Sequence, residues 1–250
     1  MSPTHLFQLL QRPLAAANYI PQLDGVRFYA LIGVLAFHCS GYLLANSPLE
    51  VANNLDGSPL VTAIHYGHYG VQLFFVISGF ILALPFLRWH CLGEKEVRLS
   101  AYFARRLTRL EPPYLINLAL LAAAHAILLH QPVSELVPHL AASAFYCHNL
   151  LFGQASTINF VAWSLEIEVQ FYLLTPVLMQ VARWRSLSGR FLLYSAGFLV
   201  PLLVRHSLTH DAAITRLLDL SIAGHLQYFV AGIAACDLYV NKQRWRRRES

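Results

Sequence analysis

The chain has 250 residues, of which 56% are hydrophobic and only 12% are Asp, Glu, Lys or Arg. A soluble domain has about 25% of these charged residues, so this chain has too little charge to cover a soluble surface. The apolar content also excludes a disordered chain. The formal net charge is +5 and the mean hydropathy is +0.48. The basic residues lie near the ends of apolar runs, which favours a membrane protein over a nucleic-acid-binding protein, whose basic residues should line a polar groove.

The cysteines and the N-terminal residues give no sign of an exported disulfide-rich protein. Cys39, Cys91, Cys147 and Cys236 form no C-x-x-C pair, which favours buried free thiols over disulfides or a zinc site. The N-terminal residues lack an apolar core followed by a small-residue cleavage site, so no removable signal peptide is expected. Because no linker or repeat interrupts the chain, residues 1–250 are expected to form a single membrane domain.

Hydrophobic segments follow one another along the whole chain. A transmembrane helix needs about 20 apolar residues, and the gaps between charged residues locate the candidates. Seven segments are predicted, at residues 26–46, 67–87, 112–130, 136–152, 161–182, 191–207 and 220–240. The expected fold is therefore an all-α integral membrane protein, a polytopic helical bundle.

The distribution of Lys and Arg predicts the orientation of the segments. The stretches rich in Lys and Arg are 88–111, 183–190 and the C-terminal tail, and those without either residue are 47–66 and 131–160. The positive-inside rule places the first group in the cytoplasm and the second group outside. Seven alternating crossings cannot satisfy this distribution. Six crossings can, if segment 136–152 dips into the membrane or lies at its surface, and both the N-terminus and the basic tail are then cytoplasmic.

The first segment contains a histidine far from either end. Arg27 lies near the inner end, and His38 follows eleven residues later, about 16 Å along a helix. His38 is therefore expected near the middle of the membrane, where an ionisable side chain is a functional candidate. A histidine can act as a general base near neutral pH. From position alone, a packed histidine whose ring is satisfied by a polar neighbour is an equally open alternative.

Two further groups of charged residues are candidates for function. Arg106 and Arg109 share one helix face, which suits a phosphate-bearing ligand or, equally, simple anchoring at the cytoplasmic side. Glu166 and Glu168 lie in the fifth segment and, being two residues apart, face different directions, so they are not a paired acid dyad. One is expected near the interface and the other beside His38 or an arginine. The alternative is that both lie at the headgroup level without a specific role.

Two other patterns favour structural interpretations. Gly70, Ser78 and Gly79 predict close helix packing, and no His–Asp spacing supports Ser78 as a nucleophile. His65 and His68 form an H-x-x-H pair, but the sequence offers no third ligand, so no metal is expected.

Four motifs in this order resemble the acyltransferase 3 family, whose members are integral membrane proteins that O-acylate sugars. The motifs are L-D-G-x-R with F-H (residues 23–38), G-V-x-x-F-F-x-x-S-G-F (70–80), R-x-x-R-x-x-P-x-Y (106–114) and W-S-L-x-x-E-x-x-F-Y (163–172). Residues 228–232 look like the family's F-x-x-G segment. The chain departs from the family pattern at Glu166, where a neutral residue is usual, and at Val169, where an acidic residue is common.

The resemblance implies roles for individual residues. The catalytic residues it implies are His38, Glu168 and Arg27, the residues that hold acyl-CoA are Arg106 and Arg109, and the supporting residues are Tyr114, Trp163 and Tyr172. His38 would take a proton from the acceptor hydroxyl or from an intermediate carrier group. Direct transfer and a covalent acyl-enzyme both stay open. Arg27 and Glu168 would orient His38 or stabilise charge that develops in the reaction.

The implied function is an O-acyltransferase of the cell membrane. It would move an acyl group, expected to be acetyl, from acyl-CoA to a hydroxyl of a cell-envelope or exported carbohydrate, with no tightly bound cofactor and no nucleic acid. Family members usually have about ten spans, so the resemblance implies that this chain is C-terminally incomplete. Two alternatives stay open: a transporter or flippase-like protein whose His, Arg and Glu line a polar path, and a truncated, inactive family member.

Overall fold

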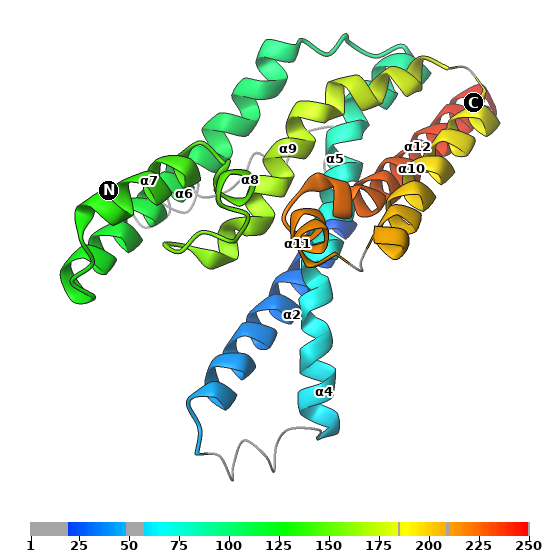
Figure 1. The fold of residues 1–250 in the computed structure, drawn as a ribbon. Coiled ribbons are helices and arrows are strands. Elements are labelled where there is room, and N and C mark those ends of the chain that lie inside the picture. The colour runs from blue at the N-terminus through cyan, green and yellow to red at the C-terminus, as the bar shows by residue number, and fades with distance from the viewer. Residues whose placement is uncertain (1–19, 49–57, 185, 209–210, 250) are drawn as a thin grey trace, which may run out of the picture. The chain divides into compact units, whose positions relative to one another are not determined.

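The computed structural model describes residues 20–48, 58–184, 186–208 and 211–249, without the side chains of Arg109, Arg248 and Glu249. Every regular element in these ranges is a helix (Figure 1). The predicted all-α fold class is therefore confirmed. The described residues up to Gly70 and those from Val71 onwards form two compact units, which are described separately.

The first unit is a helix packed against a shorter helical segment. Its elements are α2 (Pro21–Ala45), α4 (Pro59–His65) and the 3-10 turn η1 (Tyr66–Tyr69). Ser58 caps α4, since its hydroxyl oxygen accepts the amide hydrogen of Val61 at 3.2 Å. A Cβ on Gly67 would lie 2.1 Å from the carbonyl oxygen of Gly33. The contact between α2 and η1 therefore requires glycine at position 67.

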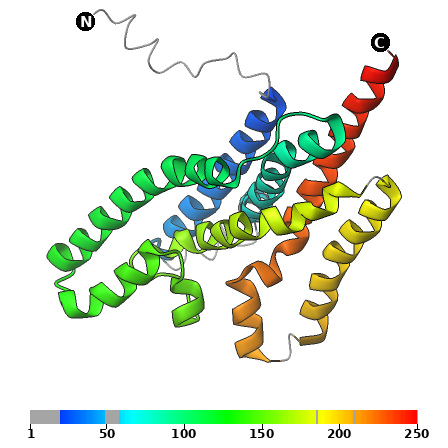
Figure 2. The same ribbon diagram turned by 90° about the horizontal axis from the view of Figure 1, so that it is seen from above.

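The second unit contains the longer helices, beginning with α5 at the boundary between the units. The helices are α5 (Gly70–Leu92), α6 (Leu99–Leu128), α7 (Val133–Ala144), α8 (His148–Phe152), α9 (Trp163–Leu178), α10 (Leu187–Leu208), α11 (Ala212–Asp219) and α12 (Leu226–Glu249). The 3-10 turns are η2 (Phe160–Ala162), η3 (Met179–Arg183) and η4 (Ile222–Gly224). α10 and α12 pack side by side (Figure 1), and α7 folds back alongside α6 (Figure 2).

Glycines allow α5 and α12 to touch backbone to backbone. A Cβ on Gly79 would lie 2.1 Å from the carbonyl oxygen of Phe229, and a Cβ on Gly232 would lie 2.0 Å from that of Val76. Phe229 is fully buried and stacks on Phe171 of α9, with ring centroids 4.0 Å apart. The predicted close packing at Gly79 is confirmed, and it joins α5, α9 and α12 in one core.

Four helical stretches are long and apolar enough to cross a membrane, judged by length and composition within the described residues. They are α2, the continuous stretch Pro59–Leu92, α6 and α10. α9 has only 16 residues, about 24 Å at 1.5 Å per residue, which is less than the hydrocarbon core of about 30 Å. α12 includes the basic tail in the same helix. The sequence predicts both helices as spans. α9 is shorter than the other four stretches, and α12 is less apolar than they are.

The predicted segment 136–152 is not one helix. α7 ends at Ala144 and α8 begins at His148, and between them Tyr146 adopts a left-handed conformation with φ of 56°. A helix of 12 residues, the length of α7, extends about 18 Å, too short to cross a bilayer. This break agrees with the expectation that the segment does not cross.

Two connections predicted between hydrophobic segments are largely helical, so the helices end and begin at other residues than the sequence predicts. α5 continues to Leu92 and α6 begins at Leu99, so only residues 93–98 of the predicted 88–111 connection are irregular. Arg190, predicted in the 183–190 connection, lies in the first turn of α10. Charge marks where an apolar run ends, but a helix ends where its backbone turns away, as at Gly93 with φ of 68°.

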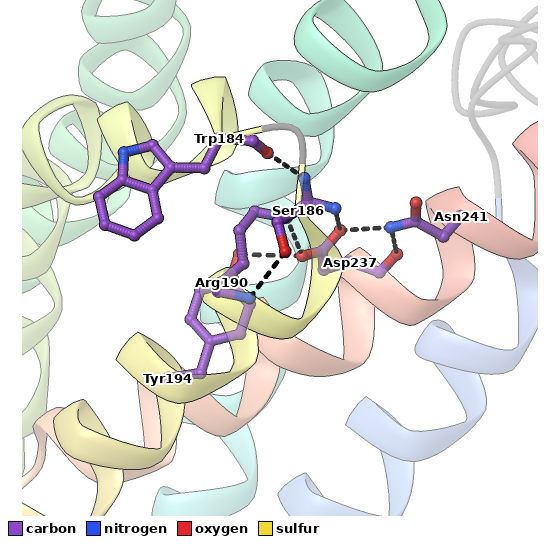
Figure 3. A network of polar contacts seen from close by, with 7 residues as sticks. Trp184, Ser186, Arg190, Tyr194, Asp237 and Asn241 are labelled. Atoms are coloured by element: carbon purple, nitrogen blue, oxygen red, sulfur yellow. Dashed lines mark hydrogen bonds and ion pairs between the residues drawn. The ribbon is translucent and has the colours of Figure 1, made fainter.

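Arg190 and Asp237 form a buried ion pair between α10 and α12 (Figure 3). Nε of Arg190 lies 2.7 Å from Oδ2 of Asp237, and Nη2 lies 3.0 Å from Oδ1; the side chains are 1% and 0% exposed. Tyr194 donates to Oδ2 at 3.1 Å, Asn241 donates to Oδ1 at 2.6 Å, and Nη1 of Arg190 donates to the Trp184 carbonyl. Both charges are therefore hydrogen-bonded on several sides inside the helix pair.

The four cysteines form no disulfide, as predicted. Cys236 is buried, Cys91 and Cys147 are half-buried, and Cys39 is exposed. The expectation of burial is therefore wrong for Cys39, because an apolar helix has several faces and only some of them pack on a neighbour.

Candidate functional site

His38 lies in the second half of α2, in a group of aromatic rings within the first unit. Its ring centroid is 5.3 Å from that of Phe37, and Phe37 also contacts His65 at 6.1 Å and His68 at 5.8 Å. Three histidines therefore surround one phenylalanine. His68 also places Nδ1 2.5 Å from the carbonyl oxygen of His65. Within the described ranges, no three His, Cys, Asp or Glu residues are grouped as metal ligands.

Arg27 lies on α2 at a distance from His38. Its Nη1 is 3.1 Å from Oδ1 of Asp24, one turn earlier, and both side chains are about one-third exposed. Because α2 is continuous from Pro21 to Ala45, the eleven intervening residues separate Arg27 from His38 by about 16 Å along the axis. The partner that the structure gives to Arg27 is therefore Asp24, and the helix holds Arg27 away from the His38 ring.

Residues from three motifs meet in the second unit. Ser78 on α5 donates a hydrogen bond of 2.5 Å to Oε1 of Glu168 on α9. Tyr172 follows Glu168 by one turn of α9, which places both on the same face, and the two side chains interact. Cζ of Arg106, on α6, lies 5.9 Å from the centroid of the Tyr172 ring, within cation–π range. We call Ser78, Arg106, Glu168 and Tyr172 the Glu168 cluster.

Buried tyrosines hold the Glu168 cluster in place. Tyr172 is 7% exposed, and its backbone carbonyl accepts a hydrogen bond of 3.2 Å from the hydroxyl of Tyr102 on α6. A cavity of about 90 Å³ opens beside Arg106 and Tyr172, with Glu111 and Tyr146 also in its wall. The cluster therefore combines a carboxylate, a hydroxyl, a phenol and a guanidinium next to a small open space.

Glu166 has a separate environment, as its spacing of two from Glu168 predicts. It is fully buried, and its Oε2 accepts the backbone N–H of Asn149 at 2.8 Å. Asn149 in turn donates its side-chain amide to the carbonyl of Trp163 at 2.9 Å. Glu166 therefore ties the start of α8 to α9, while Glu168 accepts a hydrogen bond from Ser78 of α5.

The remaining predicted residues lie apart from this cluster. The hydroxyl of Tyr114 donates to a backbone carbonyl of α7 at 2.9 Å, and its ring stacks on Tyr146, so it joins α6 to α7. Trp163 begins α9, and its ring lies 5.6 Å from that of His225. Arg109 belongs to α6, but its side chain lies outside the described part of the structure. Of the two arginines predicted to bind acyl-CoA, the structure therefore describes the side chain of Arg106 alone.

A polar region around His225 was missed by the sequence analysis. His225 is 6% exposed, and its Nε2 lies 3.0 Å from the carbonyl oxygen of Asp219. The carboxylate of Asp219 pairs with Arg205 at 2.7 Å. A signal was present in the sequence, because Ser221, His225 and Gln227 are polar residues within the predicted span 220–240.

The chain resembles known acyltransferases over most of its length. The model of the acyltransferase 3 family, described as an acyltransferase domain, matches residues 20–249. A Staphylococcus aureus (strain COL) protein named "Putative O-acetyltransferase" is 28% identical over 172 residues, which cover 65% of this chain and 25% of that protein. O-acetyltransferase OatA of Staphylococcus aureus (strain NCTC 8325) is 26% identical over 182 residues, which cover 69% of this chain and 26% of OatA. The chain thus spans about a quarter of the length of these relatives. No solved structure matches it significantly.

Proposed function

Because the chain belongs to the acyltransferase 3 family, we propose that it acts as a membrane O-acyltransferase. It moves an acetyl group from acetyl-CoA to a hydroxyl of a cell-envelope or exported carbohydrate. The O-acetyltransferase names of the relatives support acetyl as the group transferred. The observation that carries the proposal is the Glu168 cluster, because it unites polar residues of three family motifs that are far apart in the sequence.

The proposed protein is a multi-pass protein of the cell membrane, with its N-terminus and basic tail in the cytoplasm. The Lys and Arg residues of the 88–111 stretch and of the tail support this orientation. The 183–190 stretch supports it less strongly than the sequence indicates, because the charge of Arg190 is paired with Asp237. Cytoplasmic acetyl-CoA would then approach the end of the protein that carries Arg106.

In the proposed reaction, His38 acts as the general base. It takes the proton of the acceptor hydroxyl while the hydroxyl oxygen attacks the carbonyl carbon of the thioester. The carbon–sulfur bond breaks, and the thiolate of CoA receives the proton from His38. The products are an O-acetyl ester and CoA with a free thiol.

In the same proposal, the Glu168 cluster binds the donor and stabilises charge. The guanidinium of Arg106 hydrogen-bonds the CoA phosphates, with Arg109 on the same helix face as a second cation. The Tyr172 ring supports the Arg106 side chain, and the hydrogen bond from Ser78 fixes the Glu168 carboxylate. A fixed carboxylate and guanidinium supply preorganised charge for binding the donor.

The test measures turnover of radiolabelled acetyl-CoA by the purified protein in detergent, with and without carbohydrate. His38→Gln keeps the side-chain volume and hydrogen bonding but cannot take up a proton at neutral pH. Loss of a general base lowers the rate by about 10²–10⁴-fold. His65→Gln is the matched control, because His65 is an exposed histidine of the same unit and has no catalytic role in the proposal.

Two outcomes would contradict the proposal. Near-normal transfer by a well-inserted His38→Gln protein would remove His38 from the mechanism and leave Glu168 as the next candidate base. Absence of acetyl-CoA turnover by the wild-type protein, together with solute movement across liposomes that contain it, would favour the transporter alternative.

A further inference from the structure

A cavity of about 680 Å³ lies in the second unit, where α9, α10 and α11 meet the start of α12. The polar and aromatic residues in its wall include Trp163, Arg205, Asp219, His225, Gln227 and Tyr228. Its volume lies within the range of about 300–1,000 Å³ that is typical of small-molecule sites. The proposed reaction does not use the other five of these residues, which are Arg205, Asp219, His225, Gln227 and Tyr228.

The wall of this cavity has no surplus charge. Arg205 and Asp219 are the charged residues among those that line it, and Nη2 of Arg205 lies 2.7 Å from Oδ1 of Asp219. A phosphate or carboxylate ligand needs a cation that is not already neutralised. The cavity therefore suits an uncharged ligand, in contrast to the surroundings of Arg106.

His225 presents a buried acceptor next to the cavity. Its Nε2 lies 3.0 Å from the carbonyl oxygen of Asp219, and because a carbonyl only accepts hydrogen bonds, Nε2 carries the proton. Nδ1 of the neutral ring is then an acceptor, and among the described residues it has no hydrogen-bond partner. The ring is held by aromatic contacts with Phe75 at 5.3 Å and Trp163 at 5.6 Å.

Gln227 presents a second acceptor of the same kind. Its side chain is 3% exposed and donates from Nε2 to the carbonyl of Gly224 at 2.8 Å. Its Oε1 has no partner within the described part of the chain. Buried acceptors are normally hydrogen-bonded, so two such atoms on residues that line one cavity indicate a ligand with hydroxyl or N–H donors.

The segment that holds these acceptors is rigidly placed. Oε1 of Gln170, on α9, accepts the backbone N–H of Ile222 at 3.0 Å, which ties η4 to α9. A Cβ on Gly224 would lie 2.2 Å from the carbonyl oxygen of Leu218, so the turn before His225 requires glycine. The acceptors are therefore positioned before any ligand arrives, which reduces the ordering cost of binding.

We propose that this cavity binds one ring of a neutral carbohydrate, which is the acceptor of acyl transfer if the proposed function holds. Nδ1 of His225 and Oε1 of Gln227 accept hydrogen bonds from ring hydroxyls, and the guanidinium of Arg205 donates to a ring oxygen. The aromatic rings of Trp163 and Tyr228 pack against the C–H face of the sugar. The absence of a net charge selects sugars without phosphate or carboxylate groups.

Binding can be measured without any turnover, because Trp163 lies in the wall. The chain has four tryptophans, so Trp89→Phe, Trp184→Phe and Trp245→Phe leave Trp163 as the sole tryptophan, which is excited selectively over tyrosine at long wavelength. The probes are maltotriose and chitotriose, which are neutral oligosaccharides, and acetyl-CoA serves as the charged comparison. We expect saturable quenching of Trp163 by at least one oligosaccharide and no saturable response to acetyl-CoA.

Two variants in this background test the acceptors and the aromatic wall. Gln227→Leu removes Oε1 and should weaken sugar binding about tenfold, the effect of losing one hydrogen bond in a buried site. Tyr228→Ala removes the aromatic ring and should also weaken sugar binding, so the aromatic wall is tested even if Gln227→Leu folds poorly. Gln180→Leu is the matched control, because Gln180 is an exposed glutamine of the same unit that does not line this cavity.

The outcomes separate this proposal from the proposed function. Quenching by neutral sugar that Gln227→Leu weakens and Gln180→Leu leaves intact supports the site, whether or not the protein turns over acetyl-CoA. Turnover of acetyl-CoA without any saturable sugar response overturns the site and leaves acyl transfer standing. A saturable response to acetyl-CoA alone would assign the cavity to the donor and overturn the proposal as well.

Discussion

Replacing Asp237 by Ala tests whether one ion pair holds α10 to α12. In the native protein the guanidinium of Arg190 meets both carboxylate oxygens of Asp237, and Tyr194 and Asn241 donate to the same carboxylate. The substitution leaves Arg190 buried, at 1% exposure, with the carbonyl of Trp184 as its remaining hydrogen-bond partner. The destabilisation therefore arises from a charge without a counter-charge in an apolar interior.

The expected size of the effect is large. Removing one partner of a buried ion pair typically costs about 3–5 kcal/mol. In a chain of this size each kcal/mol lowers Tm by about 2–4 °C, which gives a drop of about 6–20 °C. Glu94→Ala is the matched control, because Glu94 pairs with Arg247 through side chains that are 37% and 60% exposed. An exposed pair contributes about 0–1 kcal/mol, so this change should lower Tm by less than about 4 °C.

The buried thiol of Cys236 reports on the same helix pair. Cys236 precedes Asp237 on α12 and is 0% exposed. With the other three cysteines replaced by Ala, a thiol-reactive dye in detergent reacts only when α12 opens, and heating then gives Tm. A second variant, Arg190→Met with Asp237→Leu, removes both charges and should regain most of the lost stability, because no buried charge remains unpaired.

The reasoning fails if Asp237→Ala and Glu94→Ala melt at the same temperature. It also fails if the double variant is no more stable than Asp237→Ala, since the loss would then come from packing and not from an unpaired guanidinium.

Three further predictions address the donor site, helix packing and orientation. Arg106→Ala should raise KM for acetyl-CoA and leave membrane insertion intact, with partial rescue by Arg106→Lys; an unchanged KM would make Arg106 a topological anchor. Gly79→Ala should cost about 1–3 kcal/mol, because its Cβ would lie 2.1 Å from the Phe229 carbonyl oxygen. A Cβ on Gly41 would meet no atom of the described residues within 4 Å, so Gly41→Ala should not lower Tm; equal effects would contradict the close approach of α5 and α12. Cysteines introduced at positions 186 and 245 of a cysteine-free protein should resist a membrane-impermeant reagent added from outside, and external labelling of either would exclude the six-crossing topology.

The sequence by itself determined the fold class. With 12% charged residues the chain cannot cover a soluble surface, and its apolar runs are long enough for helices that span a membrane. It also named Arg106, Glu168 and Tyr172 as site residues through motifs of one family, whereas it predicted Ser78 only as a helix-packing residue. The sequence could not show that Ser78 donates to Glu168, because 90 residues separate them and only helix pairing brings them together.

The tertiary structure decided which residues are partners and where the helices end. Spacing alone separates Glu166 from Glu168, but only the packing of α8 against α9 shows that Glu166 binds the Asn149 amide. In the sequence, Arg190 resembles a cytoplasmic anchor of a transmembrane segment. In the structure it forms a buried ion pair, because α10 starts before the apolar run and α12 brings Asp237 beside it. The physical reason is that hydropathy and helical periodicity describe one segment at a time, whereas hydrogen bonds and ion pairs between segments depend on which helix faces meet.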